Sequence, residues 1–114
     1  MGLIFKIASA EEWRDAEAAS VFEGAAVDRA DGYIHFSTAD QAPETAARYF
    51  AGRDNLVLAA IDPATLGDAL RWEPSRGGAL FPHLYAPLPL AAVRWVRTLP
   101  LGDDGRHVFG SLDE

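Results

Sequence analysis

The sequence contains no cysteine, only one lysine and no long apolar run. Without cysteine, disulfide bonds, thiolate metal sites and a cysteine nucleophile are excluded. No segment approaches the roughly 20 apolar residues that a membrane helix requires, so we expect no membrane span. The N-terminal segment does not have the pattern of a signal peptide, and we therefore expect a cytoplasmic protein.

Positive charge is also scarce, because 10 lysines and arginines face 17 aspartates and glutamates, giving a net charge of −7. A surface of this charge repels a phosphate backbone, so general nucleic-acid binding is disfavoured. Lys6 is the only lysine and the other basic residues are arginines, which leaves room for a local arginine pocket that holds one small anion. The pattern carries no information on the oligomeric state.

The length and the apolar content predict one folded domain. With 114 residues, 49% of them hydrophobic, the chain can build one core but not two. We expect a single domain over residues 1–114, with a core over about 3–99 and a polar tail over 102–114. Two N-terminal helices followed by a run of strands favour an α+β fold over alternating βαβ units.

Two capping boxes predict the helices. Ser9 and Glu12 form the first box, and the helix behind it should end near Ala19. Thr38 and Gln41 form the second box and predict another helix. Strands are expected over residues 3–8, 33–37, 56–61, 70–73, 81–85 and 93–99. The unbroken apolar run over 56–61 is typical of a central strand that is buried on both faces.

The strand predicted over 33–37 carries the first group of candidate site residues. Alternation places Tyr33, His35 and Ser37 on one face, and Thr38 follows where a helix should begin. Polar groups beside a helix start suit a sugar hydroxyl or an anion. The alternative is structural: His35 donates to a backbone carbonyl while Ser37 and Thr38 cap the helix.

The segment over 71–78 carries the second group. Glu73 lies on the predicted strand, and Arg76 precedes two glycines that allow a ligand to approach the backbone closely. The planar guanidinium of an arginine fits a carboxylate or a phosphate. The alternative is a solvated salt bridge between Glu73 and an arginine, with an ordinary hairpin turn.

The third group is an aromatic row in which alternation brings Phe81, His83 and Tyr85 to one face. Such a row can stack on a planar ring such as adenine or nicotinamide. The alternative is core packing with polar tips that reach solvent. His35 and His83 do not have the spacing of a known ligand pair, so we expect no metal site.

Three segments, "FKIASAEEW", "DGYIHFSTADQ" and "LRWEPSRGGALFPHLYAPLPLAAV", resemble the small bacterial family catalogued as domain of unknown function 952. The resemblance extends from about Phe5 to Val96. At fold level the family is similar to the ADP-ribosyltransferase superfamily, in which a split, mixed β structure opens a cleft for NAD. The resemblance therefore implies a mixed, split β-sheet core in this chain.

The same resemblance implies roles for individual residues. His35 matches the strand histidine that contacts a ribose, and Glu73 matches the late catalytic glutamate, so both are expected to be catalytic. The residues expected to bind the substrate are Tyr33, Ser37, Thr38, Arg76, His83 and Tyr85. NAD or an ADP-ribose-bearing nucleotide is the implied ligand, as a substrate and not as a bound cofactor. The alternative is a non-catalytic module of the same fold that binds a small anion, a nucleotide or a protein.

Overall fold

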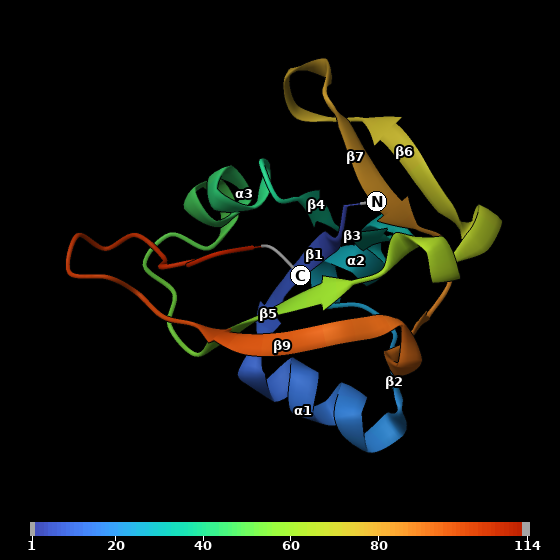
Figure 1. Cartoon of the computed structure of the whole chain (residues 1–114), viewed down its shortest axis with the longest axis horizontal. Helices are drawn as coiled ribbons and strands as arrows, with labels where there is room; N and C mark the ends of the chain where they lie inside the picture. The colour runs from blue at the N-terminus through green and yellow to red at the C-terminus, as the bar shows by residue number, and fades with distance from the viewer. Residues whose placement is uncertain (1, 113–114) are drawn as a thin grey trace.

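The computed structural model describes residues 2–112, with the exception of the Arg76 side chain. A four-stranded sheet forms the centre of the molecule, and a hairpin projects from it at the top of the view in Figure 1. Within the described residues, no helix has the length and apolar character needed to cross a membrane.

The central sheet contains β1 (Ile4–Ser9), β4 (Ser37–Thr38), β5 (Leu56–Ile61) and β9 (Val93–Leu99). Its strand order is β4-β1-β5-β9, and the neighbouring strands run antiparallel. β5 lies between β1 and β9, and five of its six residues are buried. The prediction of a central strand that is buried on both faces is therefore confirmed.

Two smaller sheets complete the β structure. One has the order β3-β7-β6, from β3 (Ile34–His35), β7 (Leu80–Leu84) and β6 (Leu70–Pro74). The other pairs β2 (Val21–Phe22) with β8 (Leu88–Pro89). All strand pairs among the described residues are antiparallel. The β structure is thus split as expected, but the expectation of mixed strand directions is wrong.

The helix α1 (Ala10–Ala19) begins where predicted, because the Ser9 hydroxyl accepts from the Glu12 amide and the Glu12 carboxylate accepts from the Ser9 amide. The Thr38–Gln41 pair also forms reciprocal hydrogen bonds. These bonds close the turn before α3 (Ala42–Tyr49), so this helix begins after its predicted box. Short 3-10 turns lie at Pro63–Thr65, Gly67–Ala69, Arg76–Gly78 and Leu90–Ala92.

A third helix, α2 (Ala26–Asp31), was not predicted. It has only six residues, and its N-cap residue Ala25 has no side chain that could cap it. Gly32 ends it in a left-handed conformation with φ 89°. The expectation of two N-terminal helices before the strands is therefore wrong, since three helices alternate with short strands in the first half of the chain.

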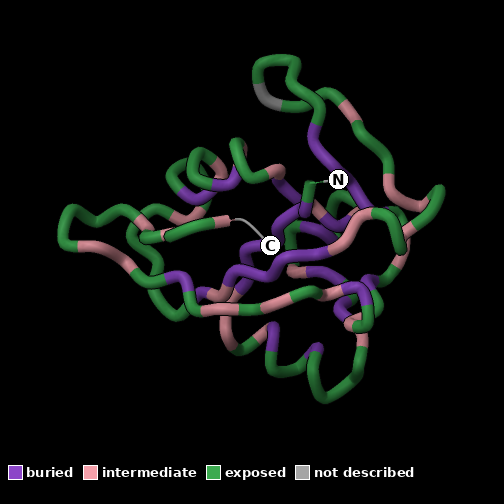
Figure 2. The backbone as a smooth tube through the Cα atoms, viewed as in Figure 1, coloured by how far each residue is buried: buried purple, intermediate pink, exposed green. Residues whose placement is uncertain are grey.

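Within the central sheet, β1 and β5 are buried on both faces, whereas β9 is mostly half-buried or exposed (Figure 2). On one face, buried side chains of β1 and β5 meet those of α1 and β3; this cluster includes Ile4, Trp13, Ile34 and Ile61. On the other face, the cluster of β1, β5 and α3 includes Phe5, Ala46, Leu58 and Leu99. Phe109 and Leu112 pack against this second cluster, so part of the predicted polar tail covers the core.

Candidate functional site

One face of the three-stranded sheet carries most of the predicted site residues. His35 of β3 lies directly opposite His83 of β7, and Arg71 of β6 lies opposite His83 on the other side. Side chains two residues apart on a strand share a face, so Tyr33 joins His35 and Glu73 joins Arg71. Segments that are far apart in the sequence thus meet on one surface, as alternation predicts.

Four rings form a cluster with Tyr33 at its centre. The Tyr33 ring centre lies 4.6 Å from that of His35, 4.2 Å from that of His83 and 5.2 Å from that of Tyr85. The two imidazole centres are 5.6 Å apart. Burial, together with the negative charge of nearby carboxylates, raises the pKa of Tyr33, which therefore remains a neutral phenol at physiological pH.

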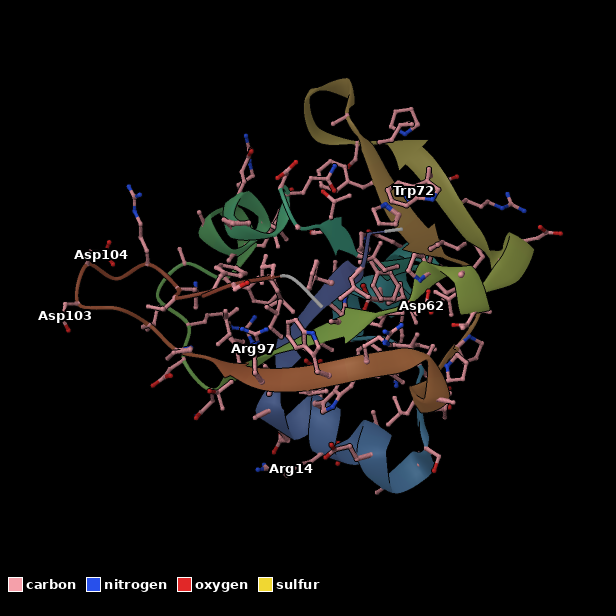
Figure 3. The ribbon with its side chains drawn as sticks, in the orientation of Figure 1. Arg14, Asp62, Trp72, Arg97, Asp103 and Asp104 are labelled. Carbon is pink, nitrogen blue, oxygen red and sulfur yellow. The ribbon has the colours of Figure 1, made fainter. Side chains whose placement is uncertain are left out.

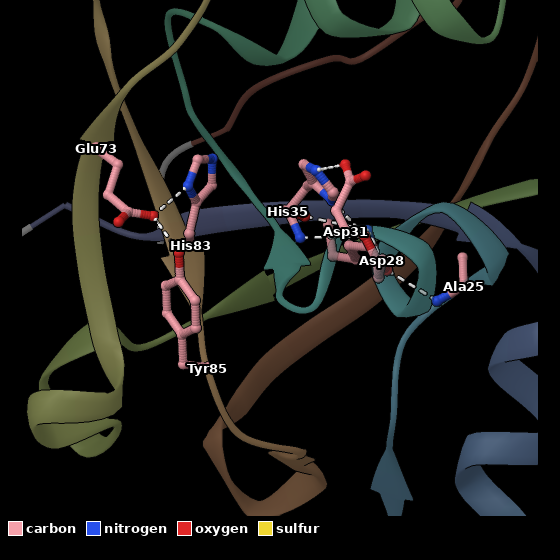
Figure 4. Close-up of polar contacts among 8 residues, drawn as sticks. Ala25, Asp28, Asp31, His35, Glu73, His83 and Tyr85 are labelled. Atoms are coloured by element: carbon pink, nitrogen blue, oxygen red, sulfur yellow. Dashed lines mark hydrogen bonds and ion pairs between the residues drawn. The ribbon is translucent and has the colours of Figure 1, made fainter.

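Glu73 joins two of these rings through one carboxylate oxygen (Figure 4). Its Oε1 lies 2.8 Å from Nδ1 of His83 and accepts a 2.7 Å hydrogen bond from the Tyr85 hydroxyl. These hydrogen bonds lower the pKa of Glu73, and the bond to Glu73 raises the pKa of Tyr85. Since an ionised carboxylate only accepts, Nδ1 of His83 carries the proton. No other described residue bonds to the imidazole, so its Nε2 has no partner among the described residues.

His35 lies between two carboxylates. Its Nδ1 is 2.6 Å from Oδ1 of Asp28, and its Nε2 is 2.9 Å from Oδ2 of Asp31. Both carboxylates belong to α2, the helix that the sequence analysis missed (Figure 4). An imidazole that faces a carboxylate at each nitrogen fits the doubly protonated, cationic form, which donates at both positions.

Asp28 is buried, with 2% of its surface exposed, and it contacts the equally buried Lys6 of β1. Lys6 Nζ lies 3.0 Å from Oδ1 and 2.9 Å from Oδ2 of Asp28. Burial alone would raise the pKa of Asp28, but hydrogen bonding to His35 and the charge of Lys6 lower it to about 2. Burial lowers the pKa of Lys6, and Asp28 opposes that shift.

Ser37 and Thr38 do not belong to this cluster, and the prediction that Ser37 shares a face with His35 is wrong. The predicted strand is interrupted at Phe36, whose amide bonds to the Pro82 carbonyl. Ser37 and Thr38 form β4, which pairs with β1 instead. The Ser37 hydroxyl is buried and bonds to Thr45 at 2.9 Å, and the Thr38 hydroxyl accepts from the amide that precedes α3.

The cluster of four rings, as far as the structure describes it, includes neither the predicted Arg76 nor a cleft. The Arg76 side chain lies outside the described residues, so its role stays a prediction. Arg71 is the arginine at this surface, with its guanidinium carbon 5.0 Å from the Tyr85 ring centre. Among the described residues Glu73 has no arginine at ion-pair distance, and the salt-bridge alternative stays a prediction for Arg76.

A cavity of about 630 Å³ lies elsewhere, on the side to which Leu70 and Trp72 of β6 point. Thr38 also lines this cavity, and none of the four rings of the cluster does. Trp72 is 46% exposed and lies on the projecting hairpin (Figure 3). The four rings therefore lie apart from this cavity, with Tyr85 41% exposed and His83 buried.

Three residues at this surface were missed by the sequence analysis: Lys6, Asp28 and Asp31. Asp28 and Asp31 fall in α2, whose six residues are too few for a periodic pattern. Lys6 was noticed only as the single lysine. The signal that could have found it is its position within the apolar strand "IFKIA", where a charged residue needs a buried partner.

The family model described as "Protein of unknown function (DUF952)" matches residues 7–96. The chain belongs to this DUF952 family. Among solved structures, this DUF952 chain is similar to the crystal structure of protein CC0527 from Caulobacter crescentus, with 53% identity over 95% of each chain and a TM-score of 0.91. The solution structure of CC0527 is 54% identical over 93% of this chain and 91% of that chain, with a TM-score of 0.84. Among curated proteins, none matches this chain.

Proposed function

We propose that the ring cluster binds NAD or another nucleotide that bears ADP-ribose, and that Glu73 promotes cleavage at the ribose. The observation that carries the proposal is the hydrogen-bonded set of Glu73, His83 and Tyr85 beside the Tyr33 ring. It extends the resemblance to the ADP-ribosyltransferase superfamily, in which a glutamate and a strand histidine act on the ribose of NAD.

The charge of Glu73 supports this chemistry. Cleavage of the bond between nicotinamide and C1′ of the ribose builds positive charge on the sugar, as in glycoside cleavage. Hydrogen bonds from His83 and Tyr85 lower the pKa of Glu73, so it stays ionised and can stabilise that positive charge. Nicotinamide leaves with the electron pair of the broken bond.

His83 can complete the transfer. Its Nδ1 faces Glu73, and its Nε2 bonds to no described residue, so Nε2 can accept a proton. Water or an acceptor hydroxyl would form the new bond to C1′ and pass its proton to Nε2. This division of roles follows the general arrangement in which a carboxylate orients a histidine that acts as base.

The remaining groups suit the other parts of a nucleotide. Tyr33 and Tyr85 offer ring surface for the base or nicotinamide. Arg71, held over the Tyr85 ring, supplies a positive charge for the diphosphate in a surface that otherwise carries carboxylates. Arg76 keeps its predicted role at the diphosphate as part of the proposal.

One observation favours the second candidate, a non-catalytic nucleotide-binding module. Both ring nitrogens of His35 are occupied by Asp28 and Asp31, so one of the two residues expected to be catalytic has no free nitrogen and can serve only in binding. On this reading the same surface would bind the ribose-bearing ligand without cleaving it.

Calorimetry with NAD, ADP-ribose and AMP tests the binding proposal. We expect NAD and ADP-ribose to bind, and the Tyr33→Ala variant to weaken both by about 5- to 150-fold, since each stacked ring is worth about 1 to 3 kcal/mol. The matched control is Glu44→Gln in the exposed Glu44–Arg48 pair of α3, which should bind as the unchanged protein does. Flat traces with all three ligands would overturn the proposal.

Nicotinamide release then separates the two candidates. If the site cleaves NAD, release should fall by at least a hundredfold in Glu73→Gln while binding of ADP-ribose persists. Binding without release in the unchanged protein would instead support the non-catalytic module.

A further inference from the structure

Lys6 and Asp28 form a charged pair in the interior, where charge is costly. Lys6 is 5% exposed and Asp28 is 2% exposed, in a part of the molecule otherwise filled by apolar side chains. Desolvating both ions costs several kcal/mol each, and well-packed apolar residues of the same volume are often as stable. The pair is therefore weak evidence for stability, and its contacts indicate what else it does.

These contacts converge on His35 from both sides. Lys6 Nζ donates to the His35 carbonyl at 3.0 Å. Asp28 Oδ1 accepts from the His35 amide at 3.1 Å and from its Nδ1 at 2.6 Å. One ion pair thus bonds to three groups of His35: its backbone amide, its backbone carbonyl and one ring nitrogen. β3 has only two residues, so strand pairing alone would fix this position poorly.

Asp28 is itself firmly held. Besides Lys6 and His35, its Oδ2 accepts from the Ala25 amide at 2.8 Å, which closes the N-terminus of α2. A carboxylate with this many donors is an oriented acceptor that cannot swing away from the imidazole. The direction in which the His35 ring points follows from the position of Asp28.

From these contacts we infer that Lys6 and Asp28 are positioning residues, which hold His35 as a cationic donor whose Nε2 faces the ligand surface. The inference rests on the proposed function and deepens it. His35 then donates to an oxygen of the ribose-bearing ligand, while His83 is the base. Asp31, which is half-exposed, occupies Nε2 of His35 when no ligand is present, and a ligand oxygen would replace it.

Long-range proton–nitrogen NMR of the three histidine rings tests the positioning without any ligand. In the unchanged protein at pH 6, both ring nitrogens of His35 should carry protons. In the double variant Lys6→Met/Asp28→Asn, which leaves neither charge buried alone, His35 should become a neutral single tautomer. Glu44→Gln, which alters only an exposed ion pair, should leave the His35 signals unchanged.

Two results would overturn the inference. One is a singly protonated His35 ring in the unchanged protein, a measurement that needs no variant to fold. The other is a folded double variant whose His35 ring signals match those of the unchanged protein.

The double variant also tests whether the Lys6–Asp28 pair affects ligand binding. If the unchanged protein binds ADP-ribose, the double variant should bind it about 10 to 100 times more weakly, the usual effect of losing a residue that orients a functional group. If no ligand binds but the ring spectra behave as expected, the proposed function fails while the positioning role stands.

Discussion

His35 and His83 lie opposite each other on neighbouring strands, and each has a carboxylate at Nδ1, yet the two carboxylates are held in different ways. Asp28, beside His35, is almost fully buried and is contacted by Lys6 and by backbone amides. The Glu73 side chain, beside His83, is 34% exposed and is contacted only by side chains of β7 and its end among the described residues.

The difference separates a charge that belongs to the fold from a charge that a ligand can reach. A buried charge that accepts from backbone amides is part of what determines the local fold, because moving it would leave several donors without a partner. A half-exposed charge that is held by an imidazole and a phenol can exchange these partners for water or a ligand at little cost. His35, whose side chain is 33% exposed, is thus fixed by a buried carboxylate, whereas the more deeply buried His83 is held by a carboxylate that can exchange its partners.

The largest effect is expected when one member of the buried Lys6–Asp28 pair is removed. Lys6→Met leaves the buried Asp28 without its lysine partner and with only the half-buried His35 imidazole as a counter-ion, and it should lower the free energy of unfolding by about 3 kcal/mol, the usual cost of breaking a buried pair. Urea unfolding measures the loss. The double variant Lys6→Met/Asp28→Asn should recover part of it, and a loss in Lys6→Met below about 1 kcal/mol would mean that the pair contributes no more than a surface one.

The second-largest effect is expected in acid, where Asp28 of the buried pair becomes protonated. The pKa of Asp28 is about 2 in the folded chain against an ordinary value of 3.8, so between these values the unfolded chain binds the extra proton. The contribution of Asp28 is therefore complete above about pH 4 and is lost as the pH falls through 2, with a total on the order of 2 kcal/mol.

Urea unfolding at a series of pH values from 7 to 2 checks this contribution. The Lys6→Met/Asp28→Asn variant should lose less stability than the unchanged protein over the acid range. Parallel pH profiles for the two proteins would contradict the assignment of the low pKa to Asp28.

The smallest effect is expected at the outer carboxylate. Glu73→Gln should leave the urea midpoint nearly unchanged, because an exposed charge contributes little to folding. The same change should lower the pKa of Tyr85 towards its ordinary value of 10, since the carboxylate that opposes ionisation of the phenol is gone. Absorbance titration of the phenolate measures this shift, and an unaltered titration would show that Glu73 and Tyr85 do not interact in solution.

The sequence alone predicted much of the ring cluster, because the alternation of side chains along a strand is a local rule. Alternation along each strand placed Tyr33 with His35 and His83 with Tyr85, and the rings of the other three residues all lie close to that of Tyr33. The Ser9 capping box also predicted the start of α1, since its hydrogen bonds span only three residues. The family assignment rested on the same segments.

The missed parts depend on contacts between distant segments. Ser37 was assigned to the wrong face because the chain leaves β7 after Phe36 and pairs with β1. Alternation within one strand does not reveal this change of partner. Asp28 was missed because its role comes from Lys6, 22 residues earlier, and from His35. Neither partner is visible in the six-residue sequence of α2.

The position of β6 at the margin of its sheet has a further consequence. In the order β3-β7-β6, β6 has a strand neighbour on one side only, and it carries Glu73. Strands at the margin of a sheet open more readily than inner ones, so β6, which carries Glu73, should exchange its amide hydrogens sooner than β7, which carries His83. Saturating the surface with a bound molecule should slow deuterium uptake along β6 before it alters any other strand.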